Sequence, residues 1–278
     1  MNFGLNIYQM LSNKTNLYIN GCSFVAGNSI EDNSVLSRVL SRELNLDFVD
    51  DSANGQSFSS TFTNTITKLS CFDNIQNYLV VIGLTWEPRY SIPFNKGLLN
   101  ITPADIGNNP KKSKFDEKYS TWRRLTSPYY VTLNGKHSPE FNSMQQDIEN
   151  SSEKVNEVLS HFRDYYEALV KHDSYIKTNQ LIDNFTKILA LQSFLDNKKI
   201  DYVFLDFKGY AKYPYVFEKN VKKETSLEKL FNTLDTTRFI DFSNDDFKLN
   251  MIDGDTSHPS KEGIKYISKL IIEKFNEL

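Results

Sequence analysis

Short apolar segments alternate with segments of helical periodicity in this chain of 278 residues, and the alternation constrains its fold more than any other feature. The clearest apolar segment, residues 78–82, ends at Gly83 and is typical of a strand buried on both faces of a sheet. Further strands are predicted at residues 16–20, 46–49, 202–205 and 239–242. Helices are predicted at residues 34–44, 58–69, 155–169, 179–195 and 260–275. This order predicts an α/β fold with a doubly wound, mostly parallel sheet flanked by helices.

Two stretches interrupt this alternation. Residues 87–152 hold most of the eight prolines, several Asn/Gly turns and few periodic segments. A structureless loop of that length is uncommon in a compact domain, so we expect an insertion there that forms a cap-like region. A second, smaller insertion is expected at about residues 210–237. The length fits a single α/β domain, residues 1–278, that carries both insertions.

Composition argues against several classes of function. The net charge of -3 offers no basic stripe for nucleic acid, and the cluster of Lys111, Lys112 and Lys114 is typical of a solvated loop. Cys22 and Cys71 form neither a disulfide framework nor a metal-like spacing. No apolar run has membrane-spanning length, and the N-terminus lacks the basic segment of a signal peptide. We therefore expect a cytoplasmic protein without nucleic-acid or membrane partners, and the sequence leaves its oligomeric state open.

Two short motifs at opposite ends of the chain carry the residues of a nucleophilic hydrolase. Residues 21–27, GCSFVAG, follow the first predicted strand and form a glycine-flanked turn that carries Ser23. Residues 253–259, DGDTSHP, place Asp255 three residues before His258, just ahead of the last predicted helix. A serine, a histidine and an aspartate form a catalytic triad by their geometry, whatever their order in the sequence.

Each of these residues also has a structural interpretation. Ser23 could be the N-cap of the helix that follows it, a position that serine favours. Asp253, Asp255 and His258 could bind a metal ion, although a calcium loop of the EF-hand type would need more carboxylates and a different glycine position. Cys22 is interpreted as a small buried apolar residue and not as a nucleophile. The presence of all three triad residue types favours the catalytic interpretation.

The predicted topology brings the two motifs to one edge of the sheet. In doubly wound sheets the working site lies beyond the carboxyl ends of the strands. The chemically interesting residues that follow the predicted strands are Ser23, Asn54, Gly55, Thr85, Trp86, Asp255 and His258. We therefore expect these residues to gather around one site.

Together, these motifs resemble the sequence blocks of the SGNH (GDSL-like) hydrolases. Residues 21–27 resemble the first block, with Cys22 where the family name has aspartate, and residues 54–55 resemble the second. Residues 255–259 match the last block, whereas residues 83–86 depart from the third, because Thr85 stands where the family has asparagine. The resemblance covers residues 17–83 and 253–278. Short SGNH-like proteins of tailed phages are similar in this respect, which suggests a phage origin and, as an alternative location, the virion.

The resemblance implies a flavodoxin-like architecture and a triad of Ser23, His258 and Asp255, without cofactor or metal. Ser23 would attack an ester carbonyl, and His258 would take its proton as general base. Asp255 would hold the imidazole in the required tautomer.

The resemblance also implies an oxyanion hole. Its donors would be the backbone N–H groups of Ser23 and Gly55, completed by the hydroxyl of Thr85 or by the indole N–H of Trp86. The residues expected to contact substrate are Asn54, Trp86 and Arg89.

Three hypotheses of function follow. The first is a serine ester hydrolase that acts through an acyl-enzyme on O-acetyl or other short acyl esters, including carbohydrate-linked ones. The second is an O-acyltransferase with the same triad, which exclusion of water by the 87–152 insertion would favour. The third is a catalytically impaired binding protein, which the substitution at Thr85 favours. Fold alone would not decide among them.

Overall fold

A parallel sheet forms the centre of this computed structural model, which describes residues 13–27, 32–53, 56–84, 90–94, 97–101, 125–126, 132–133, 136–137, 173–207, 209–212, 225–242 and 258–278. The parallel strands in the described residues are β1 (Asn16–Asn20), β2 (Asp47–Asp50), β3 (Tyr78–Leu84), β9 (Asp201–Asp206) and β10 (Phe239–Asp241). They lie in the order β2-β1-β3-β9-β10, and each neighbouring pair is parallel. This is the strand order of flavodoxin-like sheets, in which the chain reverses its direction of winding between β1 and β3.

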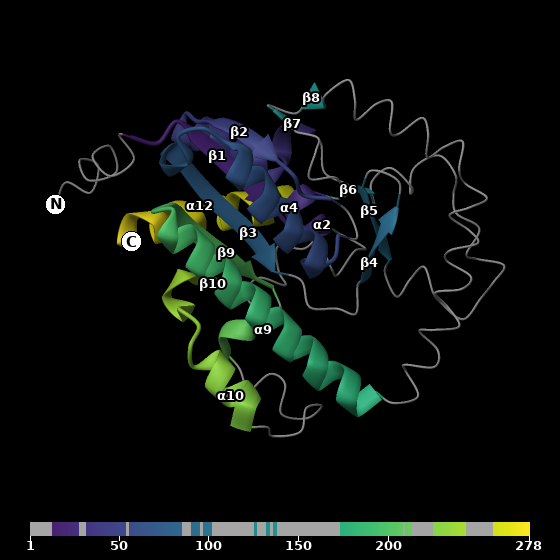
Figure 1. The fold of residues 1–278 in the computed structure, drawn as a ribbon. Coiled ribbons are helices and arrows are strands. Elements are labelled where there is room, and N and C mark those ends of the chain that lie inside the picture. The colour runs from purple at the N-terminus through teal and green to yellow at the C-terminus, as the bar shows by residue number, and fades with distance from the viewer. Residues whose placement is uncertain are drawn as a thin grey trace.

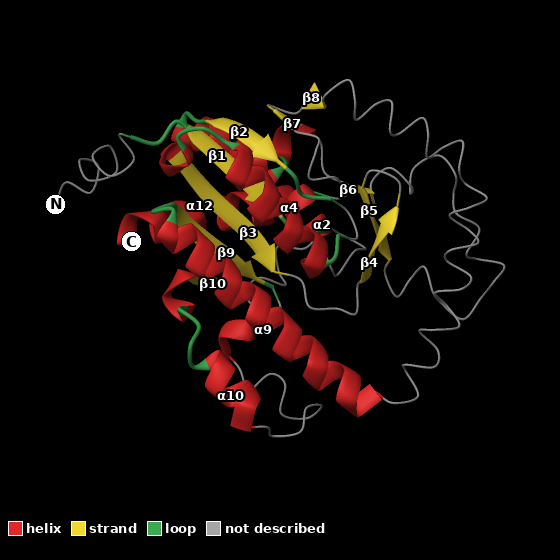
Figure 2. Cartoon of the chain, in the orientation of Figure 1, coloured by secondary structure: helices red, strands yellow, loops and turns green. Residues whose placement is uncertain are grey.

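Helices cover both faces of the sheet, which confirms the predicted α/β doubly wound fold (Figure 1). One face carries α3 (Leu36–Leu44) and α12 (Lys261–Glu277), which contact each other. The other face carries α4 (Phe58–Cys71), α9 (Asp173–Asn197) and α10 (Thr225–Phe231). Figure 2 shows the helices enclosing the strands.

The strands are buried on both faces because helices cover both sides of the sheet. Alternate residues of a strand therefore point into different apolar layers. Leu17 and Ile19 of β1 belong to the core under α3 and α12, whereas Tyr18 between them belongs to the core under α4 and α9. Residues 79–82 of β3 are fully buried, which explains why this segment is apolar throughout.

The element boundaries differ from the predicted ones by a few residues. The strand predicted at 16–20 agrees with β1, whereas β2 begins at Asp47 and not at residue 46. The helix predicted from residue 34 begins at Leu36, because Asp32–Ser34 form a 3₁₀ turn and Val35 has an extended backbone. The helix predicted at 155–169 lies outside the described residues.

The described parts of the predicted 87–152 insertion contain strands. A small antiparallel sheet consists of β4 (Tyr90–Phe94), β5 (Gly97–Ile101) and β6 (Leu125–Thr126). Two further strands, β7 (Thr132–Leu133) and β8 (Lys136–His137), extend the main sheet beyond β2 in antiparallel register. The cap-like role and the single-domain organisation stay predictions.

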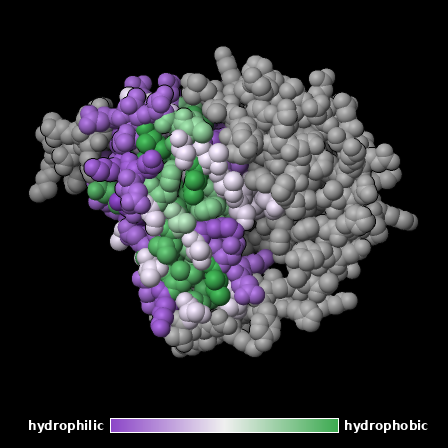
Figure 3. Space-filling model, in the orientation of Figure 1, coloured by the Kyte–Doolittle hydropathy of each residue, from purple (hydrophilic) through white to green (hydrophobic). Residues whose placement is uncertain are grey.

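The described part of the surface mixes apolar and hydrophilic residues. On the face shown in Figure 3, apolar residues gather into a band with hydrophilic residues at its borders. Half-buried side chains packed against the core under α4 and α9 include those of Phe62, Ile66, Ile182, Leu189 and Leu230. Among the described helices, none has the length and apolar character needed to cross a membrane.

Candidate active site

Ser23 lies in a sharp turn directly after β1, at the point where the winding of the sheet reverses. It is the first residue of the one-turn helix α2 (Ser23–Ala26), and the residue is 6% exposed. The helix N-cap is Cys22, which makes no side-chain capping bond, so the interpretation of Ser23 as an N-cap is wrong. Cys22 is 1% exposed and packs as a buried residue. The hydroxyl of Ser23 is therefore available for another partner.

Two glycines and a valine fix the turn against the sheet. A Cβ atom on Gly21 would lie 2.8 Å from Cγ2 of Val25 and 3.1 Å from the Cα atom of Gly83 in β3. A Cβ atom on Gly83 would meet the same Cγ2 atom of Val25. The ends of β1 and β3 can thus approach each other closely because neither glycine has a side chain. Gly27 ends α2 with a φ of 70°, a conformation that glycine adopts without strain.

His258 reaches Ser23 from the other end of the chain. Its Nε2 atom lies 2.9 Å from Oγ of Ser23, within hydrogen-bond distance. When the imidazole carries its hydrogen on Nδ1, Nε2 accepts a hydrogen bond from the hydroxyl of Ser23. His258 precedes the buried Pro259, and Ser260 caps α12 by accepting from the N–H of Gly263 at 3.1 Å. The histidine therefore stands on the loop just before a firmly capped helix.

Aromatic side chains that sequence reasoning missed form a wall beside this pair. The ring of Phe24 lies 5.3 Å from the His258 ring and 4.8 Å from that of Phe207, measured between centroids. Phe207 in turn stacks on Phe242 at 5.1 Å. Phe207 and Phe242 directly follow β9 and β10. The position of Phe207 after the strand predicted at 202–205 was a signal in the sequence, whereas Phe242 was the last residue of the strand predicted at 239–242.

The other residues predicted for the site lie outside the described residues: Asn54, Gly55, Thr85, Trp86, Arg89 and Asp255. The strands that precede residues 54 and 85 are described, and they flank β1 on its two sides. The N–H of Ala53 also donates to the carbonyl of Gly21 at 3.0 Å, so the chain after β2 runs next to the turn that carries Ser23.

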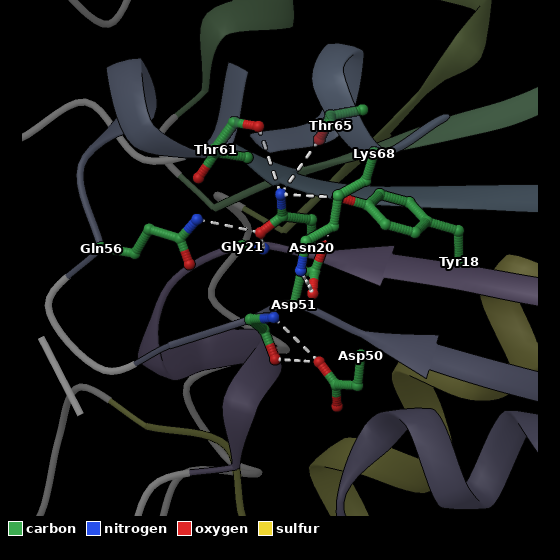
Figure 4. Close-up of polar contacts among 10 residues, drawn as sticks. Tyr18, Asn20, Gly21, Asp50, Asp51, Gln56, Thr61, Thr65 and Lys68 are labelled. Carbon is green, nitrogen blue, oxygen red and sulfur yellow. Dashed lines mark hydrogen bonds and ion pairs between the residues drawn. The ribbon is translucent and has the colours of Figure 1, made fainter. Parts of the chain in front are cut away.

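A buried polar network lies behind the turn, between β1, β2 and α4 (Figure 4). Asp51 pairs with Lys68, and it accepts from the hydroxyl of Tyr18 at 3.0 Å. Burial raises the pKa of Asp51 above its usual value, and the positive charge of Lys68 opposes the shift. Burial also raises the pKa of Tyr18, so its hydroxyl keeps its proton.

The described residues contain no group of three or more His, Cys, Asp or Glu side chains that could hold a metal ion. In comparisons with known proteins, no protein-family model matches the chain and no curated protein matches it.

Proposed function

We propose that the chain is a serine ester hydrolase of the SGNH type, with Ser23 as nucleophile and His258 as general base. The observation that carries the proposal is the 2.9 Å contact between Oγ of Ser23 and Nε2 of His258. These two residues lie 235 positions apart in the sequence and come from the two motifs that resemble the first and last blocks of the family. Their position at the reversal of the sheet supports the proposal, because ligands of doubly wound folds bind there.

In the proposed reaction, Oγ of Ser23 attacks the carbonyl carbon of the ester while Nε2 of His258 takes the hydroxyl proton. The bond to the leaving alcohol then breaks, and the imidazolium gives its proton to the leaving oxygen, which leaves an acyl group on Ser23. Water attacks this acyl-enzyme, and His258 transfers the water proton to Oγ as the acid departs. Asp255 would orient the imidazole through Nδ1. The N–H groups of Ser23 and Gly55, with Thr85, would bind the oxyanion.

The aromatic wall supports short acyl esters as the substrate class. Phe24, the residue after Ser23, and Phe207, which packs on Phe24, are both partly exposed and offer apolar surface to an acyl group or to the face of a sugar ring. We therefore propose O-acetyl or other short acyl esters, including carbohydrate-linked ones, as substrates.

Labelling with a fluorophosphonate probe tests the proposal, because the probe phosphonylates only an activated serine. We expect one labelled peptide, containing Ser23, and no labelling of the Ser23→Ala variant. Ser193→Ala removes an exposed hydroxyl on α9 and is the matched control, which should label as the wild type does.

Hydrolysis of a short-chain nitrophenyl ester gives the second readout. Ser23→Ala and His258→Ala should each remove nearly all turnover, and the double variant should lose no more, because the two residues act as a unit. Equal turnover in wild type and Ser23→Ala would exclude the proposed nucleophile. Acyl transfer to an added sugar, in place of release of the free acid, would identify the chain as an acyltransferase.

A further inference from the structure

Asn20, the last residue of β1, has a fully buried side-chain amide that forms hydrogen bonds on both of its sides (Figure 4). Its Oδ1 atom accepts from the backbone N–H of Gly21 at 2.8 Å and from Nε2 of Gln56 at 3.0 Å. Its Nδ2 atom has three acceptors within reach: Tyr18 Oη at 3.1 Å, the Thr61 carbonyl at 3.2 Å and Thr65 Oγ1 at 3.0 Å. Both ends of this buried amide are therefore satisfied.

These partners permit only one orientation of the amide. The carbonyl of Thr61 can only accept, so it requires the nitrogen of Asn20 on its side. The backbone N–H of Gly21 can only donate, so it requires the oxygen. Aspartate has the shape of this group but no donor, and leucine has neither donor nor acceptor. The site therefore specifies an amide.

The oxygen end of the amide joins the two segments that carry the proposed chemistry. Gly21 lies two residues before Ser23, and Gln56 directly follows residues 54–55, which include the proposed oxyanion donor Gly55. Gly21 is held at its N–H by Asn20 and at its carbonyl by the N–H of Ala53.

The nitrogen end of the amide is anchored in the interior. The hydroxyl of Tyr18 lies within reach of Asn20 and donates to Asp51 Oδ2, and the other carboxylate oxygen of Asp51 pairs with Lys68 of α4. The side chains of Lys68 and Asp51 are only 4% and 3% exposed. Water therefore competes little with these hydrogen bonds and this ion pair, and the Asn20 amide is anchored to the buried interior of the protein.

We propose that Asn20 is a positioning residue, whose side-chain amide fixes the Ser23 turn relative to the segment after β2 that contains Ala53 and Gln56. It touches neither substrate nor reacting atoms and acts through Gly21 and Gln56. This inference rests on the proposed function. Loss of the alignment would cost rate and not substrate binding, because a misplacement of about 1 Å in a catalytic group can cost about 10²-fold.

Two variants separate alignment from folding. Asn20→Asp removes the donor while keeping the shape, and it places a carboxylate oxygen against the Thr61 carbonyl. Gln56→Met removes the side-chain amide, and with it the Nε2 donor, at similar length. It leaves Asn20 bonded to Gly21 and serves where Asn20→Asp folds poorly. The matched control is Asn184→Asp, because Asn184 is another buried amide, which donates to the hydroxyl of Tyr210 at 2.9 Å.

The measurements are the fluorophosphonate labelling rate, kcat and KM for a nitrophenyl ester, and the melting temperature, all on folded protein. We expect Asn20→Asp and Gln56→Met to lower the labelling rate and kcat by about 10- to 100-fold, with KM changed less than about twofold. Asn184→Asp should lower the melting temperature but keep the labelling rate. Hydrogen exchange at the Gly21 amide is measured without ester turnover. It should be faster in Gln56→Met, because the Asn20 oxygen that binds this amide has lost its other donor.

The outcomes distinguish the two proposals. A wild-type protein that neither labels nor hydrolyses esters overturns the proposed function and, with it, the positioning role. An active wild type whose labelling rate is unchanged in both variants overturns the positioning role alone. The positioning role is also overturned if Asn184→Asp lowers the labelling rate as much as Asn20→Asp and Gln56→Met do. The loss of labelling would then follow from the loss of stability.

Discussion

At the scale of single residues, the proposed catalytic pair of Ser23 and His258 would need a third group that selects the tautomer with the hydrogen on Nδ1. The last motif offers Asp253 and Asp255, and we assign this role to Asp255. Asp255→Asn should lower kcat by up to ~10⁴-fold while the melting temperature is kept, because the neutral amide favours the wrong tautomer. Asp253→Asn is the matched control in the same motif and should keep most of the activity. The reverse pattern, measured as ester turnover, would transfer the role to Asp253.

At the scale of elements, the one-turn helix α2 is locked to β3 by a contact that needs glycine. A Cβ atom on Gly83 would collide with Cγ2 of Val25. Gly83→Ala should therefore displace α2, lower the melting temperature and reduce the labelling of Ser23, because overpacking costs about 1–3 kcal/mol. Val25→Ala removes the colliding methyl group, so the double variant should recover labelling relative to Gly83→Ala. If the double variant were worse than both single variants, the Val25 contact would not be the cause.

The ion pair between Lys68 of α4 and Asp51 after β2 makes a second prediction at this scale, one that depends on pH. Lys68→Met should destabilise the fold at neutral pH by about 3–5 kcal/mol, because it leaves a buried carboxylate without its partner. Burial already raises the pKa of Asp51 above the usual 3.8, and loss of Lys68 raises it further. The folded variant then binds a proton more tightly than the unfolded chain, so its stability falls as pH rises through the pKa of the folded state.

The stability deficit of Lys68→Met should accordingly shrink as the pH is lowered from about 8 towards the usual aspartate pKa. Urea unfolding across this range measures it. Asp51→Asn combined with Lys68→Met removes both charges and should be close to the wild type at every pH. A deficit that stays constant with pH would mean that lost packing, and not the buried charge, causes it.

At the scale of the whole molecule, sequence patterns predicted the strands and their parallel arrangement, because doubly buried strands must be apolar throughout. They also predicted Ser23 and His258, which the fold brings together although they are far apart in the chain. The hydrogen-bond network of Asn20, on which its proposed positioning role rests, was not predicted, because an asparagine at the end of a strand is also an ordinary turn signal. Its partners come from segments up to 45 residues away, and only their packing identifies them. The aromatic wall was missed because each of its rings comes from a different segment.

The two apolar layers share one sheet, so the described core should unfold as a single cooperative unit. Ile188 of α9 and Ile267 of α12 are both fully buried, on opposite faces of that sheet. Ile188→Ala and Ile267→Ala should each destabilise by about 2–5 kcal/mol, because each leaves a cavity in a packed layer. Both should lower the midpoint of the same calorimetric transition, with van't Hoff and calorimetric enthalpies in agreement. Lys269→Ala, on the exposed side of α12, is the control and should change stability by less than about 0.5 kcal/mol. Two transitions, each moved by only one of the isoleucine variants, would show that the layers unfold separately and would contradict the single-domain organisation.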